Sequence, residues 1–129
     1  MLLSIISPTY NEADNIIKFV NSIELALRKY DYEIIFVDDN SSDKTHEIIK
    51  SLSSKKPHVR CLRRIGRRGL SSAVIEGCLS SSSDLLLIMD ADLQHDEKKI
   101  PSMIKLIEEK KLDLVIASRF LCHEKVLGL

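Results

Sequence analysis

The chain has 129 residues, 44% of them hydrophobic and 29% charged, and its 19 basic residues balance 19 acidic ones. This length fits one domain over residues 1–129, and a net charge of zero argues against a general nucleic-acid-binding protein. The longest purely aliphatic run, residues 85–89, is far shorter than the roughly 20 residues that span a bilayer.

The amino-terminal part of the chain predicts two strands around one helix. Residues 2–7 form an apolar run closed by Pro8, which is typical of a strand. Asn11 can cap a helix, and apolar side chains recur on one face of that helix until it ends near Lys29. Residues 33–37 are β-branched or aromatic apart from the first, which predicts a buried strand.

The remainder of the chain continues the alternation of helices and strands. The pattern predicts a helix with apolar positions at Ile48, Ile49 and Leu52, a strand over residues 59–62, a short helix over 71–79, a strand over 85–89, a helix beginning near Pro101 and a fifth strand over 112–117. This alternation predicts an α/β fold, a Rossmann-like three-layer sandwich with a mainly parallel sheet. Ligands of such sheets bind beyond the carboxyl ends of the strands.

Two carboxylates directly follow the fourth predicted strand. Asp90 and Asp92 are two residues apart at the end of an extended segment, so their side chains point to the same side. Such close carboxylates repel each other unless a cation lies between them, and Mg²⁺ prefers carboxylate oxygens. The carbonyl oxygen of Gln94 is a further candidate ligand. The alternative is a solvated acidic loop that caps the next helix through Asp96.

A second acidic pair follows the second predicted strand. Asp38 and Asp39 are placed where a nucleotide-binding fold uses a carboxylate to accept hydrogen bonds from a ribose or a base. The alternative is that Asp39, Ser41 or Ser42 caps the following helix, and the two roles are compatible. Tyr10, after the first strand, either packs against a base or fills a gap beside the sheet.

A basic segment follows the third predicted strand. Residues 63–69 contain four arginines, but they have neither the Gly-x-Gly-x-x-Gly of a dinucleotide fold nor the Gly-Lys-Ser/Thr of a P-loop. These arginines either face phosphates or lipid head groups, or they form a solvated basic loop. We expect the solvated loop.

The chain resembles the family 2 glycosyltransferases of the GT-A fold, and within them it is most similar to the dolichyl- or polyprenyl-phosphate mannosyltransferases. Five motifs carry the resemblance, in the family's order and spacing across nearly all of the chain. They are Ser7-Pro8-Thr9-Tyr10-Asn11-Glu12, Val37-Asp38-Asp39-Asn40-Ser41-Ser42-Asp43, Gly69-Leu70-Ser71-Ser72-Ala73 with Gly77, Asp90-Ala91-Asp92-Leu93-Gln94-His95, and Ala117-Ser118-Arg119-Phe120.

The resemblance implies a nucleotide-sugar site and a metal site. The donor would be bound by Pro8, Tyr10, Glu12, Val37, Asp38, Asp39, Asp90 and Ala91, and the metal, Mg²⁺ or Mn²⁺, by Asp90, Asp92 and Gln94. Asp92 and Arg119 would be the catalytic residues, with Arg119 on a donor or acceptor phosphate. The implied reaction is a metal-dependent transfer of mannose from GDP-mannose to a polyprenyl phosphate, with inversion at the anomeric carbon.

The resemblance also implies where the chain works and what it lacks. Family members usually continue well past the Ser-Arg-Phe/Tyr strand, whereas here only residues 121–129 follow, so we expect a donor-binding part without the acceptor-binding part. Three widely spaced cysteines indicate a reducing compartment, and we expect a cytoplasmic chain that is peripheral at the cytoplasmic membrane face. A homodimer or a membrane-anchoring partner would cover the apolar surface left open by the missing part.

Three alternatives accompany this interpretation. UDP-glucose is the second candidate donor to a polyprenyl phosphate, because nearly the same motifs serve it in related enzymes. The chain can instead be a catalytically inactive fragment that binds nucleotide sugars. A phosphorelay receiver domain shares this length and topology, but it needs an acidic pair after the first strand and an aspartate after the third, where this chain has Pro8-Thr9-Tyr10 and Cys61-Leu62-Arg63.

Overall fold

The computed structural model describes residues 2–119, and these fall into two compact units, one up to Glu97 and one from Lys98 onward. The first unit contains β1 (Leu3–Thr9), α1 (Ile16–Ala26), β2 (Tyr32–Asp38), α2 (Thr45–Lys55), β3 (Val59–Arg63), α3 (Leu70–Leu79) and β4 (Leu85–Ile88). A short 3₁₀ turn over Glu97–Lys99 precedes α4 (Ile100–Glu109) of the second unit. Within the described residues no helix is long and apolar enough to cross a membrane.

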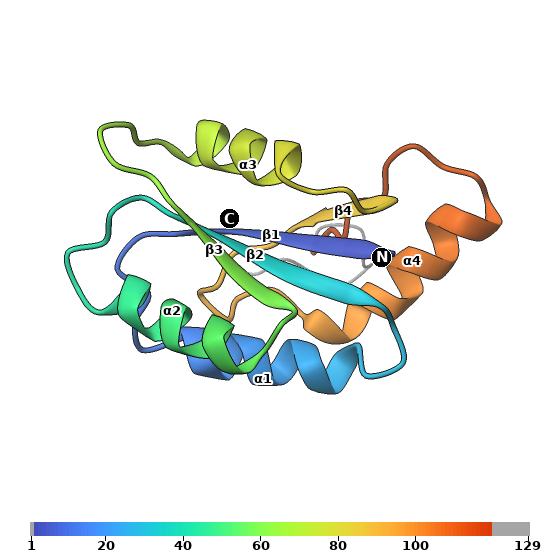
Figure 1. The fold of residues 1–129 in the computed structure, drawn as a ribbon. Coiled ribbons are helices and arrows are strands. Elements are labelled where there is room, and N and C mark those ends of the chain that lie inside the picture. Colours follow the sequence, from blue (N-terminus) through green and yellow to red (C-terminus); the bar gives the residue numbers. More distant parts are fainter. Residues whose placement is uncertain (1, 120–129) are drawn as a thin grey trace. The chain divides into compact units, whose positions relative to one another are not determined.

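The first unit is a three-layer α/β sandwich. Its sheet has the strand order β3-β2-β1-β4, and every neighbouring pair of strands is parallel. Helices α1 and α2 cover one face of the sheet and α3 covers the other (Figure 1). Parallel strands need crossover helices, and these helices bury both faces of the central strands, so the predicted fold class is confirmed.

Strands β1 and β2 are buried on both faces because they occupy the centre of the sheet. On one face, Phe36 packs edge-to-face against Phe19 of α1, with the ring centroids 5.8 Å apart. On the other face, Ile6 and Val37 pack with Ala73 of α3 in a fully buried cluster. The continuous apolar run of the second predicted strand is explained by this burial on both sides.

Helix α3 approaches the sheet closely at Gly77. A Cβ atom added at this position would come within 2.4 Å of a methyl carbon of Ile6 and 3.0 Å of one of Val37. No side chain fits there, so the position requires glycine because of the close approach of helix and sheet. This contact lets α3 cover both central strands.

The predicted fifth strand over residues 112–117 is wrong, because this segment forms no strand in the described structure. Leu114 and Ile116 are each 71% exposed. Apolar and β-branched residues favour an extended backbone, but a strand exists only where its backbone groups pair with a neighbour. The segment has no such paired neighbour among residues 2–119.

The first helix is shorter than predicted, since it covers Ile16–Ala26 and not the segment from Asn11 to near Lys29. Asn11 has a left-handed backbone, with φ of 54°. Its side-chain oxygen accepts hydrogen bonds from the backbone N–H groups of Ser42 and Asp43 at 3.0 and 3.2 Å. Asn11 therefore ties the loop after β1 to the loop after β2 and does not cap a helix.

Strand β1 continues through Pro8, which the sequence pattern placed just beyond its end. Even-numbered residues of β1 bond to β4, as the hydrogen bond from the Met89 N–H to the Ile6 carbonyl shows. The pairing with β4 ends at Ile88, opposite Ile6. The N–H that proline lacks would point to a position where the neighbouring strand has already ended, so no ladder hydrogen bond is lost. The longer strand places Tyr10 at the edge of the sheet.

Candidate functional site

Loops of the first unit leave the sheet at one edge. Tyr10, Asp39 and Asp90 follow the carboxyl ends of β1, β2 and β4, and these strands are parallel. The loops after β1, β2 and β3 lie at the same end of the sheet (Figure 1). This edge is the place where an open parallel sheet binds its ligands.

A pocket of about 270 Å³ lies beside the ends of β1, β2 and β3. Its wall is formed by Tyr10, Asp39, Asn40, Arg64, Gly66, Arg67 and Arg68. The wall therefore combines an aromatic ring, a carboxylate and several guanidinium groups. This mixture suits a ligand that carries an aromatic ring, hydroxyl groups and negative charge.

Arg64 is the buried centre of the pocket wall. Its side chain is only 1% exposed. Its Nε and Nη2 atoms donate to the two carboxylate oxygens of Asp39 at 2.6 and 3.0 Å, which is the bidentate geometry of strong pairs. The hydrogen bond from Arg64 is the main cause that lowers the pKa of Asp39, and burial opposes it. Asp39 is therefore ionised at neutral pH and held in one orientation.

The same guanidinium group also binds α3. Arg64 Nη1 donates to Glu76 Oε2 and to Ser72 Oγ, each at 2.8 Å, and Nη2 donates to the Gly69 carbonyl at 2.9 Å. The N–H of Gly69 in turn donates to Asp39 Oδ2 at 2.9 Å. Arg64 thus joins the ends of β2 and β3 to the start of α3. The expectation of a solvated basic loop is wrong for this arginine.

Strand register is the signal that could have found this pair. Asp38 and Arg63 are partners in the parallel pairing of β2 and β3. The residues that follow them, Asp39 and Arg64, therefore leave the sheet side by side. A solvated basic loop was the default expectation for these arginines, whereas the register places Arg64 beside Asp39 and buries it.

Asp38 holds the loop after β2 and does not line the pocket. It is completely buried. Its Oδ1 accepts from the hydroxyls of Thr9 and Ser41 at 2.9 and 2.6 Å, and its Oδ2 accepts from the Ser41 N–H at 3.0 Å. At the start of α2, Asp43 Oδ1 accepts a hydrogen bond from the Thr45 N–H at 2.9 Å. This role was predicted for Asp39, Ser41 or Ser42.

The remaining residues predicted to bind the nucleotide part of the donor do not line the pocket. Val37 is completely buried in the core, and its strand partner Pro8 is half-buried. Glu12 accepts a hydrogen bond from the Asn15 side chain at 3.0 Å. Ala91 is buried between the two carboxylates that follow β4.

Tyr10 presents its ring to the pocket. The side chain is about half exposed, and the guanidinium carbon of Arg68 lies 4.5 Å from the ring centroid. A guanidinium group at this distance makes a cation–π contact. The ring therefore does not fill a gap beside the sheet, which was one of the two roles left open for it.

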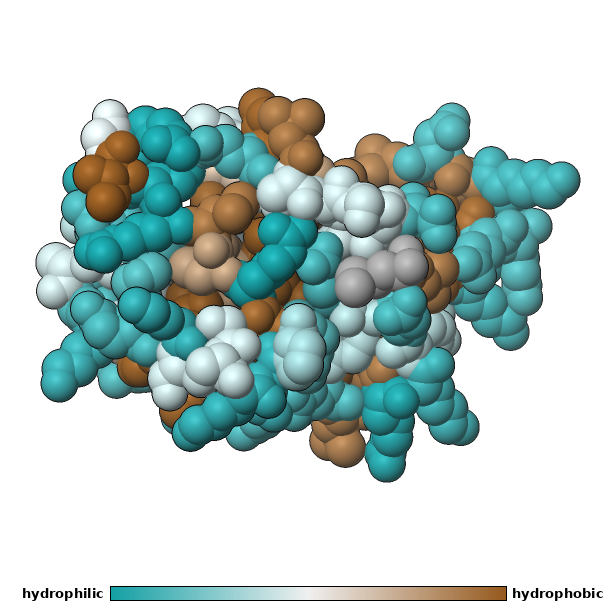
Figure 2. Space-filling view, in the orientation of Figure 1, coloured by the Kyte–Doolittle hydropathy of each residue, from teal (hydrophilic) through white to brown (hydrophobic). Residues whose placement is uncertain are grey.

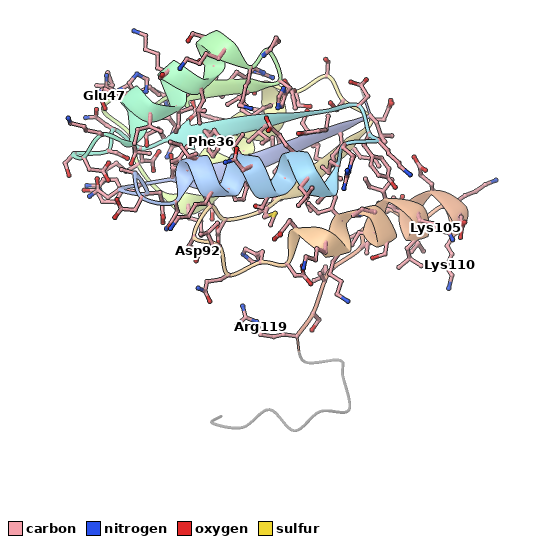
Figure 3. The ribbon with its side chains drawn as sticks, turned by 90° about the horizontal axis from the view of Figure 1, so that it is seen from below. Phe36, Glu47, Asp92, Lys105, Lys110 and Arg119 are labelled. Atoms are coloured by element: carbon pink, nitrogen blue, oxygen red, sulfur yellow. The ribbon has the colours of Figure 1, made fainter. Side chains whose placement is uncertain are left out.

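The acidic loop after β4 presents two carboxylates. Asp90 Oδ2 lies 3.3 Å from His95 Nε2, and Asp92 Oδ1 accepts the Gln94 N–H at 3.1 Å. Within residues 2–119 neither carboxylate pairs with a lysine or an arginine. Asp92 lies outside the sheet, on the loop itself (Figure 3).

The oxygen atoms of this loop are of the kind that a divalent cation shared with a ligand would bind. Asp90, Asp92 and Gln94 offer oxygen atoms, which Mg²⁺ and Mn²⁺ prefer. In the described part of the chain, no three His, Cys, Asp or Glu side chains lie close enough together to hold a metal ion. Mg²⁺ is commonly bound through one or two carboxylates plus water and substrate phosphates, so a site of this kind is completed by the substrate.

Arg119, the other predicted catalytic residue, belongs to the second unit. It follows α4 and is exposed (Figure 3). Phe120, the last residue of its motif, lies outside the described residues, as does Cys122.

The pattern of glycosyl transferase family 2 matches residues 4–127. Over 126 residues the chain is 45% identical to a dolichol-phosphate mannosyltransferase of Pyrococcus furiosus, which covers 98% of this chain and 35% of that protein. Over 117 residues it is 35% identical to a dolichol-phosphate mannosyltransferase of Saccharomyces cerevisiae, which covers 86% of this chain and 43% of that protein. The chain thus spans less than half the length of these curated relatives.

Solved structures share the fold. A mannosyltransferase from Pyrobaculum calidifontis, in complex with GDP-Man and Mn²⁺, has a TM-score of 0.70 and 24% identity, covering 81% of this chain and 32% of that one. TarS of S. aureus, residues 1–349 in complex with UDP, has a TM-score of 0.69 and 24% identity, covering 84% and 32%. At these identities the likeness shows the fold alone. The match over residues 4–127 shows that the chain belongs to glycosyl transferase family 2.

Proposed function

We propose that this chain is the donor-binding part of a metal-dependent, inverting glycosyltransferase that moves mannose from GDP-mannose to a polyprenyl phosphate. The observation that carries the proposal is the pocket with an aromatic ring and an oriented carboxylate, at the sheet edge that also carries the acidic loop. A nucleotide sugar has the matching base, ribose and diphosphate. Similarity to dolichol-phosphate mannosyltransferases from three organisms, at 34–45% identity, supports mannose and the lipid acceptor.

In this proposal the pocket binds the nucleoside. The base would pack against the half-exposed Tyr10 ring, one face of which Arg68 covers. The oxygens of Asp39 are engaged by Arg64 and by the Gly69 N–H, but Oδ1 takes only one of these bonds and can accept another from a ribose or a base. Arg64 keeps this carboxylate ionised and aimed. The other residues proposed to bind the nucleotide are Pro8, Glu12, Asp90 and Ala91, whereas Val37 and Asp38 are buried and would only support the residues that do so.

The acidic loop serves the diphosphate. Asp90, Asp92 and Gln94 would hold Mg²⁺ or Mn²⁺, which when bound neutralises the negative charge of the leaving nucleoside diphosphate. Asp92 and Arg119 are the proposed catalytic residues, with Arg119 on a donor or acceptor phosphate. The GDP-Man and Mn²⁺ bound by the Pyrobaculum calidifontis enzyme support this choice of donor and metal.

The proposed reaction needs no strong general base. A phosphate monoester is ionised near neutral pH, so one of its oxygens can attack the anomeric carbon directly. The bond from this carbon to the nucleoside diphosphate breaks, the configuration inverts, and the diphosphate leaves with the electron pair. The residues of the pocket are therefore required to bind and orient the donor and not to remove a proton.

Thermal unfolding in the presence of nucleotide sugars tests donor binding. GDP-mannose with Mn²⁺, at about 100 times its Kd, is expected to add about 2.7 kcal/mol of stability and so to raise the Tm. Asp92→Asn is expected to abolish the rise, whereas Asp84→Asn, beside the other end of β4, is the matched control and keeps it. A larger rise with UDP-glucose would replace GDP-mannose by the second candidate donor.

Transfer is tested with radiolabelled GDP-mannose, Mn²⁺ and a polyprenyl phosphate, by counting the label in the lipid extract. The chain spans 35% of the Pyrococcus furiosus relative, so donor binding and transfer are separate questions. Donor binding without labelled lipid would identify an inactive nucleotide-sugar-binding fragment. A lack of binding to any of the nucleotide sugars would contradict the proposal as a whole.

A further inference from the structure

The loop that joins β3 to α3 combines positive charge with exposed aliphatic side chains. We call residues 63–70 the arginine loop; they comprise this loop with the last residue of β3 and the first residue of α3, and they contain four arginines and no acidic residue. Ile65 and Leu70 in this loop are 65% and 64% exposed. Single exposed aliphatic residues are common, but two of them on one short basic loop are typical of a segment that binds a membrane surface.

Two glycines shape the arginine loop. Gly66 and Gly69 have φ values of 80° and 126°, in the region that residues with a side chain rarely adopt. The loop lies at the same end of the sheet as the loops after β1 and β2 (Figure 1). Apolar surface stands among hydrophilic residues over this part of the molecule (Figure 2). The aliphatic side chains of the loop are thus offered to a partner outside the core.

Two of the four arginines form no ion pair within residues 2–119. Arg64 and Arg67 both bind Glu76. Arg63 donates to a neutral amide oxygen and Arg68 covers an aromatic ring, and neither has an ion pair in the described structure. The loop therefore presents cations beside its aliphatic side chains.

We propose that the arginine loop docks the chain on an anionic phospholipid bilayer. Ile65 and Leu70 enter the boundary between head groups and acyl chains. Arg63 and Arg68 bind head-group phosphates, because a guanidinium group pairs with phosphate oxygens through two N–H groups. A protein partner fits less well, since a standard interface buries about 800 Å² on each side, which is more than two aliphatic side chains on one short loop provide.

Docking would bring the candidate pocket to the lipid surface. Gly66, Arg67 and Arg68 belong to the arginine loop and also line the pocket. A lipid phosphate acceptor resides at that surface, so the donor and the acceptor would meet there. This consequence rests on the proposed function, whereas the docking itself does not.

Vesicle sedimentation tests docking in the absence of nucleotide, metal and acceptor, so its outcome is independent of transferase activity. The 129-residue chain is mixed at low salt with vesicles of phosphatidylcholine, or of phosphatidylcholine with phosphatidylglycerol. We expect binding only to the anionic vesicles, and its loss at high salt, because arginines supply much of the attraction. Failure to bind the anionic vesicles would overturn the proposal.

Variants locate the docking surface. Ile65→Ser combined with Leu70→Ser is expected to weaken vesicle binding at least about tenfold, and Arg63→Gln about fivefold. Leu25→Ser is the matched control, because Leu25 is also 65% exposed but lies on α1, and it should leave binding unchanged. Thermal melting checks that each variant is folded. If the double variant binds as well as the control, the arginine loop is not the docking surface.

Fluorescence gives a second readout that keeps the rest of the loop intact. The chain has no tryptophan, so Ile65→Trp introduces a single probe in the loop and Leu25→Trp a single probe on α1. Anionic vesicles are expected to shift the emission of Ile65→Trp to the blue and to leave that of Leu25→Trp unchanged. An equal response of the two would contradict the proposal. Analytical ultracentrifugation gives a further test. A dimer of the native chain that is lost in the Ile65→Ser, Leu70→Ser double variant would also contradict the proposal, because the loop would then bind a second copy.

Discussion

Replacement of Arg64 by methionine is expected to lower the free energy of unfolding by about 3–5 kcal/mol. The arginine side chain is 1% exposed and donates two hydrogen bonds to Asp39, whose own side chain is 12% exposed. Methionine retains much of the volume but leaves this carboxylate charged, largely out of water and without its cation. The expected loss is a large fraction of the roughly 5–15 kcal/mol that stabilises a typical domain.

Urea unfolding of matched variants tests the reasoning. Arg64→Met combined with Asp39→Asn is expected to recover part of the loss, because the double variant has no unpaired carboxylate at that position. Arg67→Met is the control, since Arg67 is 56% exposed and pairs with Glu76 at the surface, so its replacement should change stability little. A loss for Arg64→Met no greater than that for Arg67→Met would refute the account of this buried pair.

Three further predictions concern the scaffold. Gly77→Ala is expected to lower the free energy of unfolding by about 1–3 kcal/mol in denaturant titrations. The clash of the new methyl group with the sheet outweighs the gain in helix propensity, which is at most about 1 kcal/mol. Unchanged or increased stability would contradict the close approach of α3 to the sheet. Ser7→Ala is expected to raise that free energy by about 1 kcal/mol, since the buried hydroxyl has no hydrogen-bond partner among the described residues; Ser4→Ala, which removes a bond to Glu33, should lower it. The hydrogen bond from Arg60 is the main cause that lowers the pKa of Glu33. The ionised Glu33 therefore contributes fully to the free energy of unfolding above the unfolded pKa of about 4.3, and this contribution is lost as the pH falls through the lower pKa of the folded state. Unfolding measured across this acid range should show a decline that Glu33→Gln makes shallower.

The fold was predictable wherever the local pattern of apolar residues in the sequence is enough to indicate a buried element. The strand predicted over residues 33–37 is apolar on both faces because it lies at the centre of a covered sheet, and the structure has it as part of β2. The segment 112–117 has a similar composition but forms no strand in the described structure. Propensity is a property of the segment, whereas strand formation also depends on a partner strand, which the segment's own sequence does not report.

The candidate site was predictable where its residues directly follow a strand, and it was missed where they depend on distant contacts. The change from an apolar run to acidic residues in the sequence marked Asp39 and Asp90, although β2 itself extends one residue further, to the buried and hydrogen-bonded Asp38. The partner of Asp39 was not identified, since Arg64 is 25 positions away and its burial depends on register. Asn11 was taken for a helix cap because local spacing favours that role, whereas its side chain bonds to the loop after β2.

In the proposed function, Asp90 and Asp92 bind a divalent cation together with the nucleotide sugar. Electron paramagnetic resonance measures this binding directly, because the solution signal of free Mn²⁺ weakens when the ion is bound. With GDP-mannose present, the native chain should reduce the signal further than the nucleotide alone, and so should Asp84→Asn. Asp90→Asn combined with Asp92→Asn should return the signal to the level of the nucleotide alone, and an equal reduction by the native chain and this double variant would contradict the account.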